Sequence, residues 1–398
     1  MNNARSLLTS LAQILLVCLS IAGCTPGAGR QVQARLNLSG SVESGDVISA
    51  LNPQDSDGFK RAQPGDVLAF PDDYGPHPDY QIEWWYYTGN LETDEGRHFG
   101  FQLTFFRRAL VPPEERISRS SVWSTDQVFL AHFALSDVAG EKFYAFERYS
   151  RGAAGLSGAS ADPYHVWLYD WEVEQIAPDR YTLDASQENV KIRLELNDVK
   201  GPILHGERGY SQKGPQPGNA SYYFSQTRLE SSGEIQIGEQ SYPVSGLSWM
   251  DHEFSTNALT VNQVGWDWFS LQLDDGSELM VFQIRRADGS IDPFSSGTLI
   301  EADGSVHSLA QTGFSIQPLE TWRSPHSGGV YPSAWKITLP EFDLSLDLKP
   351  YLDDQELRLT LTYWEGAVQV SGARAGAALR GDGYVELTGY TQPDGQSP

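Results

Sequence analysis

Three titratable residues stand side by side in the stretch WMDHEFS, where Asp251, His252 and Glu253 are flanked by aromatic side chains. Side chains alternate along a β-strand, so Asp251 and Glu253 would share one face while His252 points to the other. If the shared face is interior, repulsion and desolvation keep one carboxyl group protonated near neutral pH. Such an acid can protonate a carbon–carbon double bond, and aromatic ring faces stabilise the resulting cation.

In this hypothesis Asp251 or Glu253 is the acid, and His252 is the base that orients the water. The aromatic wall expected to stabilise a cation consists of Trp249, Trp266, Trp268 and Tyr222. A structural alternative is open as well. Asp251 and His252 would then pair with each other or cap a turn between domains, while Glu253 is solvated.

A long irregular stretch, Gly201 to Ser221, precedes this segment and is rich in Gly and Pro. Loops of this length are uncommon unless they are functional or mobile. The residues here and just beyond that are expected to contact a ligand are His205, Tyr210, Lys213, Tyr222 and Tyr223. The stretch is interpreted either as a gate at a barrel mouth or as a solvated hairpin packed over the domain seam.

Two further aromatic groups favour a structural interpretation. The Trp pairs Trp84/Trp85 and Trp266/Trp268 are most economically core residues that close the barrel bottoms, with cavity lining as the alternative. In TYWEGAVQVSG, the simplest interpretation is likewise a core strand, and it predicts that this strand ends in an exposed Glu365.

Several other kinds of chemistry have no support in the sequence. The eight histidines form no HxH or HExxH spacing, so no metal is expected. GLSWM lacks the second glycine of a nucleophile elbow, and no glycine-rich loop opens a helix, so no cofactor is expected either. The formal net charge of −24 argues against nucleic acid as a partner.

An internal duplication organises the chain. EWWYYTGNL leads into HFGFQLTFFRR, and GWDWFSLQL leads into ELMVFQIRR, so each half has a Trp pair, a turn and a strand that ends in a double Arg. We infer two related modules joined at the Asp-His-Glu segment, one spanning residues 59–245 and the other 246–392. Short alternating strands at 8- to 12-residue spacing predict an all-β chain of two lipocalin-like antiparallel β-barrel domains in tandem.

The first 58 residues are expected to lie outside this fold. Residues 1–23 have a positive start and an apolar run, and small residues precede Cys24, as in a lipoprotein signal peptide. Cys24 would then be acylated, and residues 24–58 would form a flexible tether. An ordinary secretory signal is the alternative. The expected location is the periplasmic side of a bacterial envelope, anchored by lipid to the outer membrane.

The segments PDDYGPHPDYQIEWWYYTGN, LHGERGYSQKG, NASYYFSQTRL, GLSWMDHEFS, GWDWFSLQLDDGSELMVFQIR and YWEGAVQVSG resemble the AttH and carotenoid 1,2-hydratase family, often labelled predicted secreted hydrolases. The resemblance runs from about Phe70 to Tyr390. It implies paired lipocalin-like barrels and an apolar, unsaturated ligand, since family members include hydratases of isoprenoid double bonds and fungal relatives that direct Diels-Alder cyclisations. Asp251, His252 and Glu253 match the family motif.

The resulting hypothesis is an envelope-anchored protein that binds an isoprenoid or lipid-like ligand and hydrates a C=C bond by acid catalysis. A non-catalytic lipid carrier and a scaffold of an envelope export complex are the alternatives. The expected partners are a hydrophobic small molecule or lipid, and the membrane through acylated Cys24, with an envelope transporter complex as a further partner.

Overall fold

The computed structural model describes residues 56–391 except 119, 258 and 261. The expected signal peptide, Cys24 and all but the last three residues of the expected tether lie outside this range. The helical segments described are single 3-10 turns: η1 (Asp72–Tyr74), η2 (Pro113–Glu115), η3 (Gln311–Gly313) and η4 (Pro340–Phe342). None of the described helices has the length and apolar character needed to cross a membrane.

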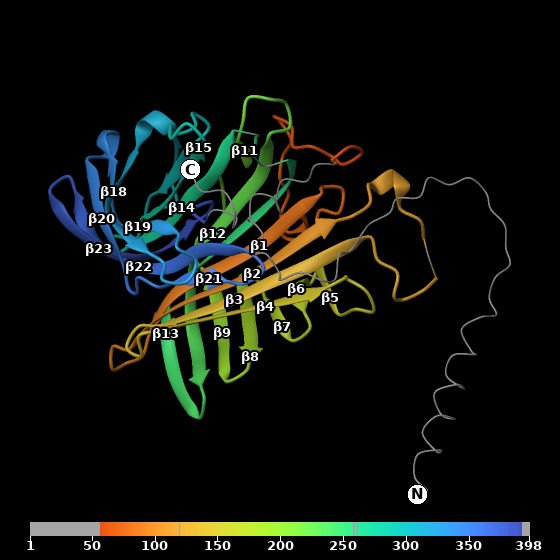
Figure 1. Ribbon diagram of the computed structural model, residues 1–398, viewed down its shortest axis with the longest axis horizontal. Coiled ribbons are helices and arrows are strands. Elements are labelled where there is room, and N and C mark those ends of the chain that lie inside the picture. The colour runs from red at the N-terminus through yellow and green to blue at the C-terminus, as the bar shows by residue number, and fades with distance from the viewer. Residues whose placement is uncertain (1–55, 119, 258, 261, 392–398) are drawn as a thin grey trace, which may run out of the picture. The chain divides into compact units, whose positions relative to one another are not determined.

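The first sheet has 13 strands, all paired antiparallel (Figure 1). Their bounds are β1 (Ile82–Glu92), β2 (His98–Ala109), β3 (Gln127–Asp137), β4 (Lys142–Ser150), β5 (Ser157–Ala161), β6 (Tyr164–Leu168), β7 (Trp171–Ala177), β8 (Arg180–Gln187), β9 (Val190–Asp198), β10 (Pro202–Leu204), β11 (Tyr210–Gln212), β12 (Ala220–Ile237) and β13 (Gln240–Asn257). The strand order is β4-β3-β2-β1-β13-β12-β9-β8-β7-β6-β5, and β10 and β11 also pair with β12.

The second sheet has 10 strands. Their bounds are β14 (Gln263–Leu273), β15 (Glu278–Arg286), β16 (Ser296–Ile300), β17 (Val306–Ala310), β18 (Ser315–Arg323), β19 (Val330–Leu339), β20 (Leu344–Pro350), β21 (Glu356–Arg358), β22 (Thr362–Arg374) and β23 (Ala377–Leu387). The order is β17-β16-β15-β14-β23-β22-β20-β19-β18, with β21 on β22. The prediction of an all-β fold of two lipocalin-like antiparallel barrels in tandem is confirmed.

The change from one sheet to the other comes later in the chain than expected. The predicted boundary after residue 245 falls inside β13, which pairs with β1 and β12 along its length. Asp251, His252 and Glu253 therefore belong to the last strand of the first sheet. The second sheet begins at Gln263 of β14, because both edges of β13 are already paired with strands of the first sheet.

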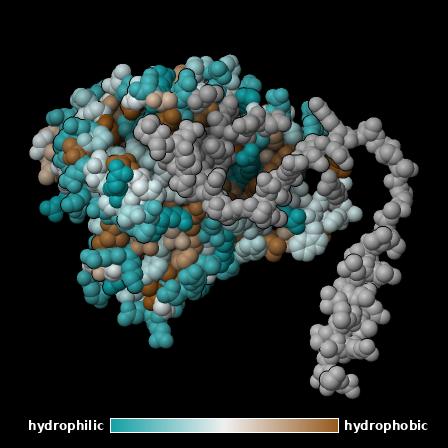
Figure 2. Space-filling model, viewed as in Figure 1, coloured by the Kyte–Doolittle hydropathy of each residue, from teal (hydrophilic) through white to brown (hydrophobic). Residues whose placement is uncertain are grey.

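Alternation along the strands explains the cores. In β9 the apolar side chains Val190, Ile192, Leu194 and Leu196 are buried, while Lys191, Arg193 and Glu195 between them are exposed. Each sheet wraps one large apolar cluster, with Trp85 and Trp171 in the first and Trp335 and Trp364 in the second. The face shown in Figure 2 is largely hydrophilic, with hydrophobic residues in small separate patches.

The duplication inferred from the sequence is visible in the strand pairing. β1 lies between β2 and β13, and β14 lies between β15 and β23. In the first hairpin Glu83 is opposite Arg107, and in the second Gly265 is opposite Arg285. Arg107 and Arg285 thus occupy equivalent positions, and so do Tyr86 and Trp268, each three residues further along the first strand of its hairpin.

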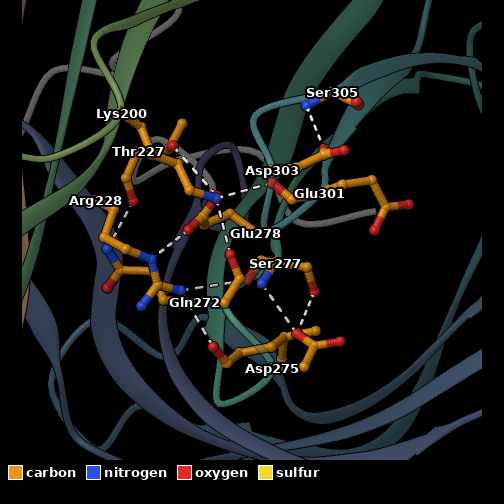
Figure 3. Close-up of polar contacts among 12 residues, drawn as sticks. Lys200, Thr227, Arg228, Gln272, Asp275, Ser277, Glu278, Glu301, Asp303 and Ser305 are labelled. Carbon is orange, nitrogen blue, oxygen red and sulfur yellow. Dashed lines mark hydrogen bonds and ion pairs between the residues drawn. The ribbon is translucent and has the colours of Figure 1, made fainter.

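Polar contacts join the two sheets around Glu278 at the start of β15 (Figure 3). Its carboxylate accepts hydrogen bonds from Lys200 Nζ at 2.7 Å and from Arg228 Nε, both supplied by the first half of the chain. Burial raises the pKa of Glu278, and the two cations oppose that shift. Since removing one partner of a buried ion pair is costly, this contact stabilises the association of the two sheets.

Candidate active site

An acid-lined cavity of about 90 Å³ lies where the two sheets meet. β1, β2, β12 and β13 contribute one wall, and β14, β15, β22 and β23 contribute the other. Most of the lining is aromatic or aliphatic. The acidic side chains that line it are Asp251, Glu253, Glu365 and Glu386.

The alternation expected for β13 is present. Asp251 and Glu253 line the cavity, whereas His252 does not and lies on the other face of the strand. Cross-strand pairing places Tyr86 beside Asp251 and Trp84 beside Glu253, and both rings also line the cavity. The strand period therefore delivers two carboxylates and two aromatic rings to the same space.

Asp251 is surrounded by hydrogen-bond donors. Tyr223 Oη donates to Oδ2 at 2.6 Å, Trp249 Nε1 donates to Oδ1 at 2.6 Å, and Ser225 Oγ donates to Oδ1. Tyr223 Oη in turn accepts from Trp268 Nε1 at 2.9 Å. Burial raises the pKa of Asp251 to about 7, although the three donated bonds oppose the shift. At neutral pH this group can therefore both take and release a proton.

His205 continues the chain of hydrogen bonds behind Asp251. Its Nε2 lies 2.6 Å from Ser225 Oγ and its Nδ1 lies 2.9 Å from Thr298 Oγ1. Burial lowers the pKa of His205 to about 3, so the ring is neutral. Because the Ser225 hydroxyl donates its hydrogen bond to Asp251, Nε2–H of His205 must donate to Ser225, and Nδ1 must accept from Thr298. Each hydrogen bond in this series is therefore donated in the direction of Asp251.

Glu253 has a different environment from Asp251, two residues away. Lys213 Nζ lies 3.1 Å from its Oε1, and Ser221 Oγ also donates to that oxygen. The ammonium group is also 4.1 Å from the centre of the Phe282 ring. Glu253 is therefore paired with a cation, whereas Asp251 is held by neutral donors, so the two carboxyl groups of β13 are not equivalent.

The second half of the chain supplies a pair of acids, Glu365 on β22 and Glu386 on β23, at directly opposed positions. Burial, and next the neighbouring Glu386, hold the pKa of Glu365 well above its usual range. Burial likewise raises the pKa of Glu386 to about 7, against a hydrogen bond from Trp266. Oε2 of Glu365 has no hydrogen-bond partner within the described chain. One proton at least is therefore held by this pair at neutral pH.

On the far side of β13, His252 belongs to a separate charged cluster. Its Nε2 lies 2.9 Å from Oε1 of the fully buried Glu83, and His77 Nδ1 lies 2.8 Å from the same oxygen. Arg107 Nε donates to Oε2 of Glu83 at 2.7 Å. Burial alone would raise the pKa of Glu83, but Arg107 and the two histidines hold it well below its usual range.

His77, Glu83 and His252 each offer one ligand atom within 4.8 Å of the others, as a metal site would. The guanidinium of Arg107 already neutralises Glu83 at 2.7 Å, however, and His77 Nε2 is 2.9 Å from Asp73. A divalent cation would have to share a carboxylate with that guanidinium, and their charges repel. The internal ion pairs account for this cluster, so we assign no metal to it.

The residues predicted to contact a ligand separate into three sets. Lys213, Tyr223, Trp266 and Trp268 line the cavity. Trp249 and His205 lie behind it and reach Asp251 directly or through Ser225. Tyr210 and Tyr222 pack instead with Tyr80 and Phe254 on the other face of the sheet, where Tyr222 Oη bonds to Asp66.

Glu365, Glu386 and Trp84 line the cavity, although no motif in the sequence grouped them with Asp251. The expectation of an exposed Glu365 at the end of a strand is wrong: the residue is buried near the start of β22, where it pairs with Glu386 of β23. The core interpretation of the Trp pairs holds for Trp85, whereas Trp84, Trp266 and Trp268 line the cavity. The duplication was the available signal, since β23 repeats the position of β13 beside the first strand of its sheet.

The fold and the site define a class of protein with two antiparallel barrels and a largely apolar, acid-lined cavity at their junction. Residues 61–390 match the AttH-like family model, and the chain belongs to that family. A crystal structure of the AttH candidate of Nitrosomonas europaea is 37% identical, covers 84% of this chain and all of its own, and superposes with a TM-score of 0.75.

Other relatives have names that refer to hydration or its reverse. The dehydratase asqC of Emericella nidulans is 24% identical over 236 residues, which cover 54% of this chain and 63% of that protein. The chain thus matches less than two thirds of its length. Kievitone hydratase of Nectria haematococca shares the fold, with a TM-score of 0.63 at 14% identity over 84% of this chain and 97% of its own.

Proposed function

We propose that this protein catalyses the addition of water to a carbon–carbon double bond of an apolar ligand, or the reverse elimination, in the cavity between its barrels. The observation that carries the proposal is the acid pair Glu365/Glu386, which holds a proton at an apolar cavity wall and leaves one oxygen of Glu365 without a partner. The names of the hydratase and dehydratase relatives support the same reaction class.

In this mechanism Glu365 gives its proton to one alkene carbon, and the positive charge develops on the other. Trp84, Trp266 and Trp268 line the cavity and present aromatic surface that stabilises such a cation. Water then forms the new C–O bond and passes a proton to ionised Asp251. One proton leaves Glu365 and one arrives at Asp251, so the site returns to its starting state when a proton passes back through solvent. Dehydration follows the same steps in reverse.

This assignment revises the roles expected from the sequence. Glu253 is paired with Lys213, so we do not assign it the role of the acid. His252 is separated from the cavity by β13 and acts as a structural partner of Glu83.

Oxygen exchange tests the proposal even while the natural substrate is unidentified. Tertiary alcohols of prenyl, terpenoid and polyene type are incubated with the protein in H₂¹⁸O, and label in the alcohol is measured by mass spectrometry. A hydratase running in both directions exchanges the hydroxyl oxygen, and Asp251→Asn should abolish the exchange. If ligands bind but no member of the panel exchanges oxygen, the carrier hypothesis replaces the enzymatic one.

We further propose that acylated Cys24 anchors the chain on the periplasmic side of a bacterial outer membrane, where it meets membrane-derived ligands. The lipobox-like residues before Cys24 support this. The check is labelling with radioactive palmitate: wild type should incorporate label and fractionate with membranes, and Cys24→Ser should do neither. A labelled Cys24→Ser variant would contradict the anchor.

A further inference from the structure

A second, larger hollow opens beside the acid cavity. This outer groove has a volume of about 610 Å³, compared with about 90 Å³ for the inner cavity. It is formed where β1 and β3 begin and β2 and β4 end, and Leu361 of the second half closes one side. Phe106 and Leu361 line both spaces, so one thin partition separates the groove from the acids.

The groove collects large apolar side chains that remain open to solvent. Trp123 is 60% exposed, Tyr149 49%, Tyr169 47% and Leu156 39%. They come from separate segments of the first half and converge only in the folded chain. Contiguous exposed apolar surface of this kind marks a binding site, because the free energy gained on binding grows with the apolar area withdrawn from water.

The wall shared by the two spaces is apolar on both sides and firmly held. Leu361 clusters with Leu357 and Tyr363, and this cluster packs against Leu130 of the groove and Trp266 of the cavity. The backbone of Thr360, next to Leu361, donates to Glu147 at 3.1 Å. Tyr149 Oη bonds to Thr360 Oγ1 as well. The groove is thus preformed, and Phe106 is the less buried of the two side chains that line both spaces.

We propose that the outer groove binds the apolar remainder of an elongated ligand whose unsaturated or hydroxylated end passes Phe106 into the acid cavity. The inference rests on the proposed function and adds a substrate class: ligands with a long apolar tail, in preference to short alkenes. The inner cavity supports this, since at roughly 10–15 Å³ per water it admits only the reacting end of a ligand and a few waters. A long apolar tail needs the additional room that the groove supplies.

Two alcohols with the same reactive end but different tails test the groove. Prenol has one isoprene unit and farnesol has three, and binding is followed by ligand-observed NMR on the folded chain. Wild type should bind farnesol at least about 100-fold more tightly, because each methylene withdrawn from water contributes roughly fourfold. The double variant Trp123→Glu/Leu156→Glu puts charges on two exposed groove positions. It should lose at least about tenfold in farnesol affinity and keep its prenol affinity.

The matched control is Leu319→Glu/Val330→Glu, which changes two similarly exposed apolar residues that line neither space. It should bind both alcohols as wild type does, and thermal melts should show both double variants folded. If the groove variant binds farnesol as tightly as the control does, or loses prenol affinity in parallel, the groove proposal is contradicted while the proposal for the inner site is not. If wild type binds neither alcohol, the proposed function fails and the groove inference fails with it.

Discussion

The two halves of the molecule place an acid at the same position and give it opposite neighbours. Asp251 on β13 is paired with Tyr86, and Glu386 on β23 is paired with Trp268, the residue equivalent to Tyr86. On their other side Asp251 meets Ser225, a donor, whereas Glu386 meets Glu365, a second acid. One cross-strand position therefore decides whether the acid is a hydrogen-bonded proton acceptor or half of a proton-holding pair.

A second comparison concerns the cations that are paired with acids outside the cavity and are missing from three of the four cavity acids. Each half pairs an arginine of its second strand with a buried acid of its first strand: Arg107 with Glu83 at 2.7 Å, and Arg285 with Asp267 at 3.0 Å. These acids are neutralised by cations, whereas the buried Asp251 and Glu365 and the half-buried Glu386 have no arginine or lysine among the hydrogen bonds that the structure describes for them. Burial without a cation raises a carboxyl pKa, and this makes the cavity suited to proton transfer.

The largest expected effect comes from removing the proton donor. Glu365→Gln keeps the shape and should lower the rate of oxygen exchange by roughly 10²–10⁴-fold, the usual contribution of general acid catalysis. Ligand affinity should change little. Glu341→Gln, an exposed acid of the same half, is the control and should exchange at the wild-type rate. Full activity in Glu365→Gln would mean that the pair has no catalytic part.

The two arginine pairs should differ in stability. Arg107→Met leaves the buried Glu83 with only its two histidine partners and should cost roughly 3–5 kcal/mol of unfolding free energy. Arg285→Met should cost less, because the Arg285 side chain is 18% exposed against 1% for Arg107. Urea unfolding of both variants measures the difference. Equal losses would show that the burial of the pair is not what distinguishes the halves.

Asp251 should make stability depend on pH in a defined window. Its pKa is raised from 3.8 to about 7 by burial, so between about pH 4 and pH 7 the native state holds a proton that the unfolded state has released. Stability should therefore fall as pH rises through this window, by at most roughly 4 kcal/mol from this group. Asp251→Asn should make that fall smaller in urea titrations, while the raised pKa of Glu386 keeps part of it, and exposed Asp94→Asn should leave it intact. An unchanged slope in Asp251→Asn would show that Asp251 ionises normally.

The smallest expected effect concerns Ser225, whose hydroxyl donates a hydrogen bond to Asp251. Its hydrogen bond lowers the pKa of Asp251, so Ser225→Ala should move the acid limb of the pH–rate profile upward by roughly one unit. Ser231→Ala removes a buried hydroxyl that pairs with Ser248 on the same strands and is the matched control. An acid limb that stays in place in Ser225→Ala would assign it to a group other than Asp251.

Much of the fold could be predicted from the order of residue types. The alternation in Asn189–Asp198 follows from the two-residue period of a strand with one wet face, and the repeated Trp and double-Arg segments are the β1/β2 and β14/β15 hairpins. The same period put Asp251 and Glu253 on one face and His252 on the other. These are local properties, set by backbone geometry and burial of one strand face, so they do not depend on which strands pair.

The partners of Asp251 depended on long-range pairing. Ser225 and Tyr86 reach it through two different strand registers, and Glu365 and Glu386 join the same cavity from more than 100 residues further along the chain. The sequence alone determined the all-β class, the duplication and the face on which Asp251 lies. Only the tertiary structure decided that Glu365 holds a proton while Glu83 stays charged, because a carboxyl pKa is set by neighbours and burial that strand pairing and barrel packing bring together.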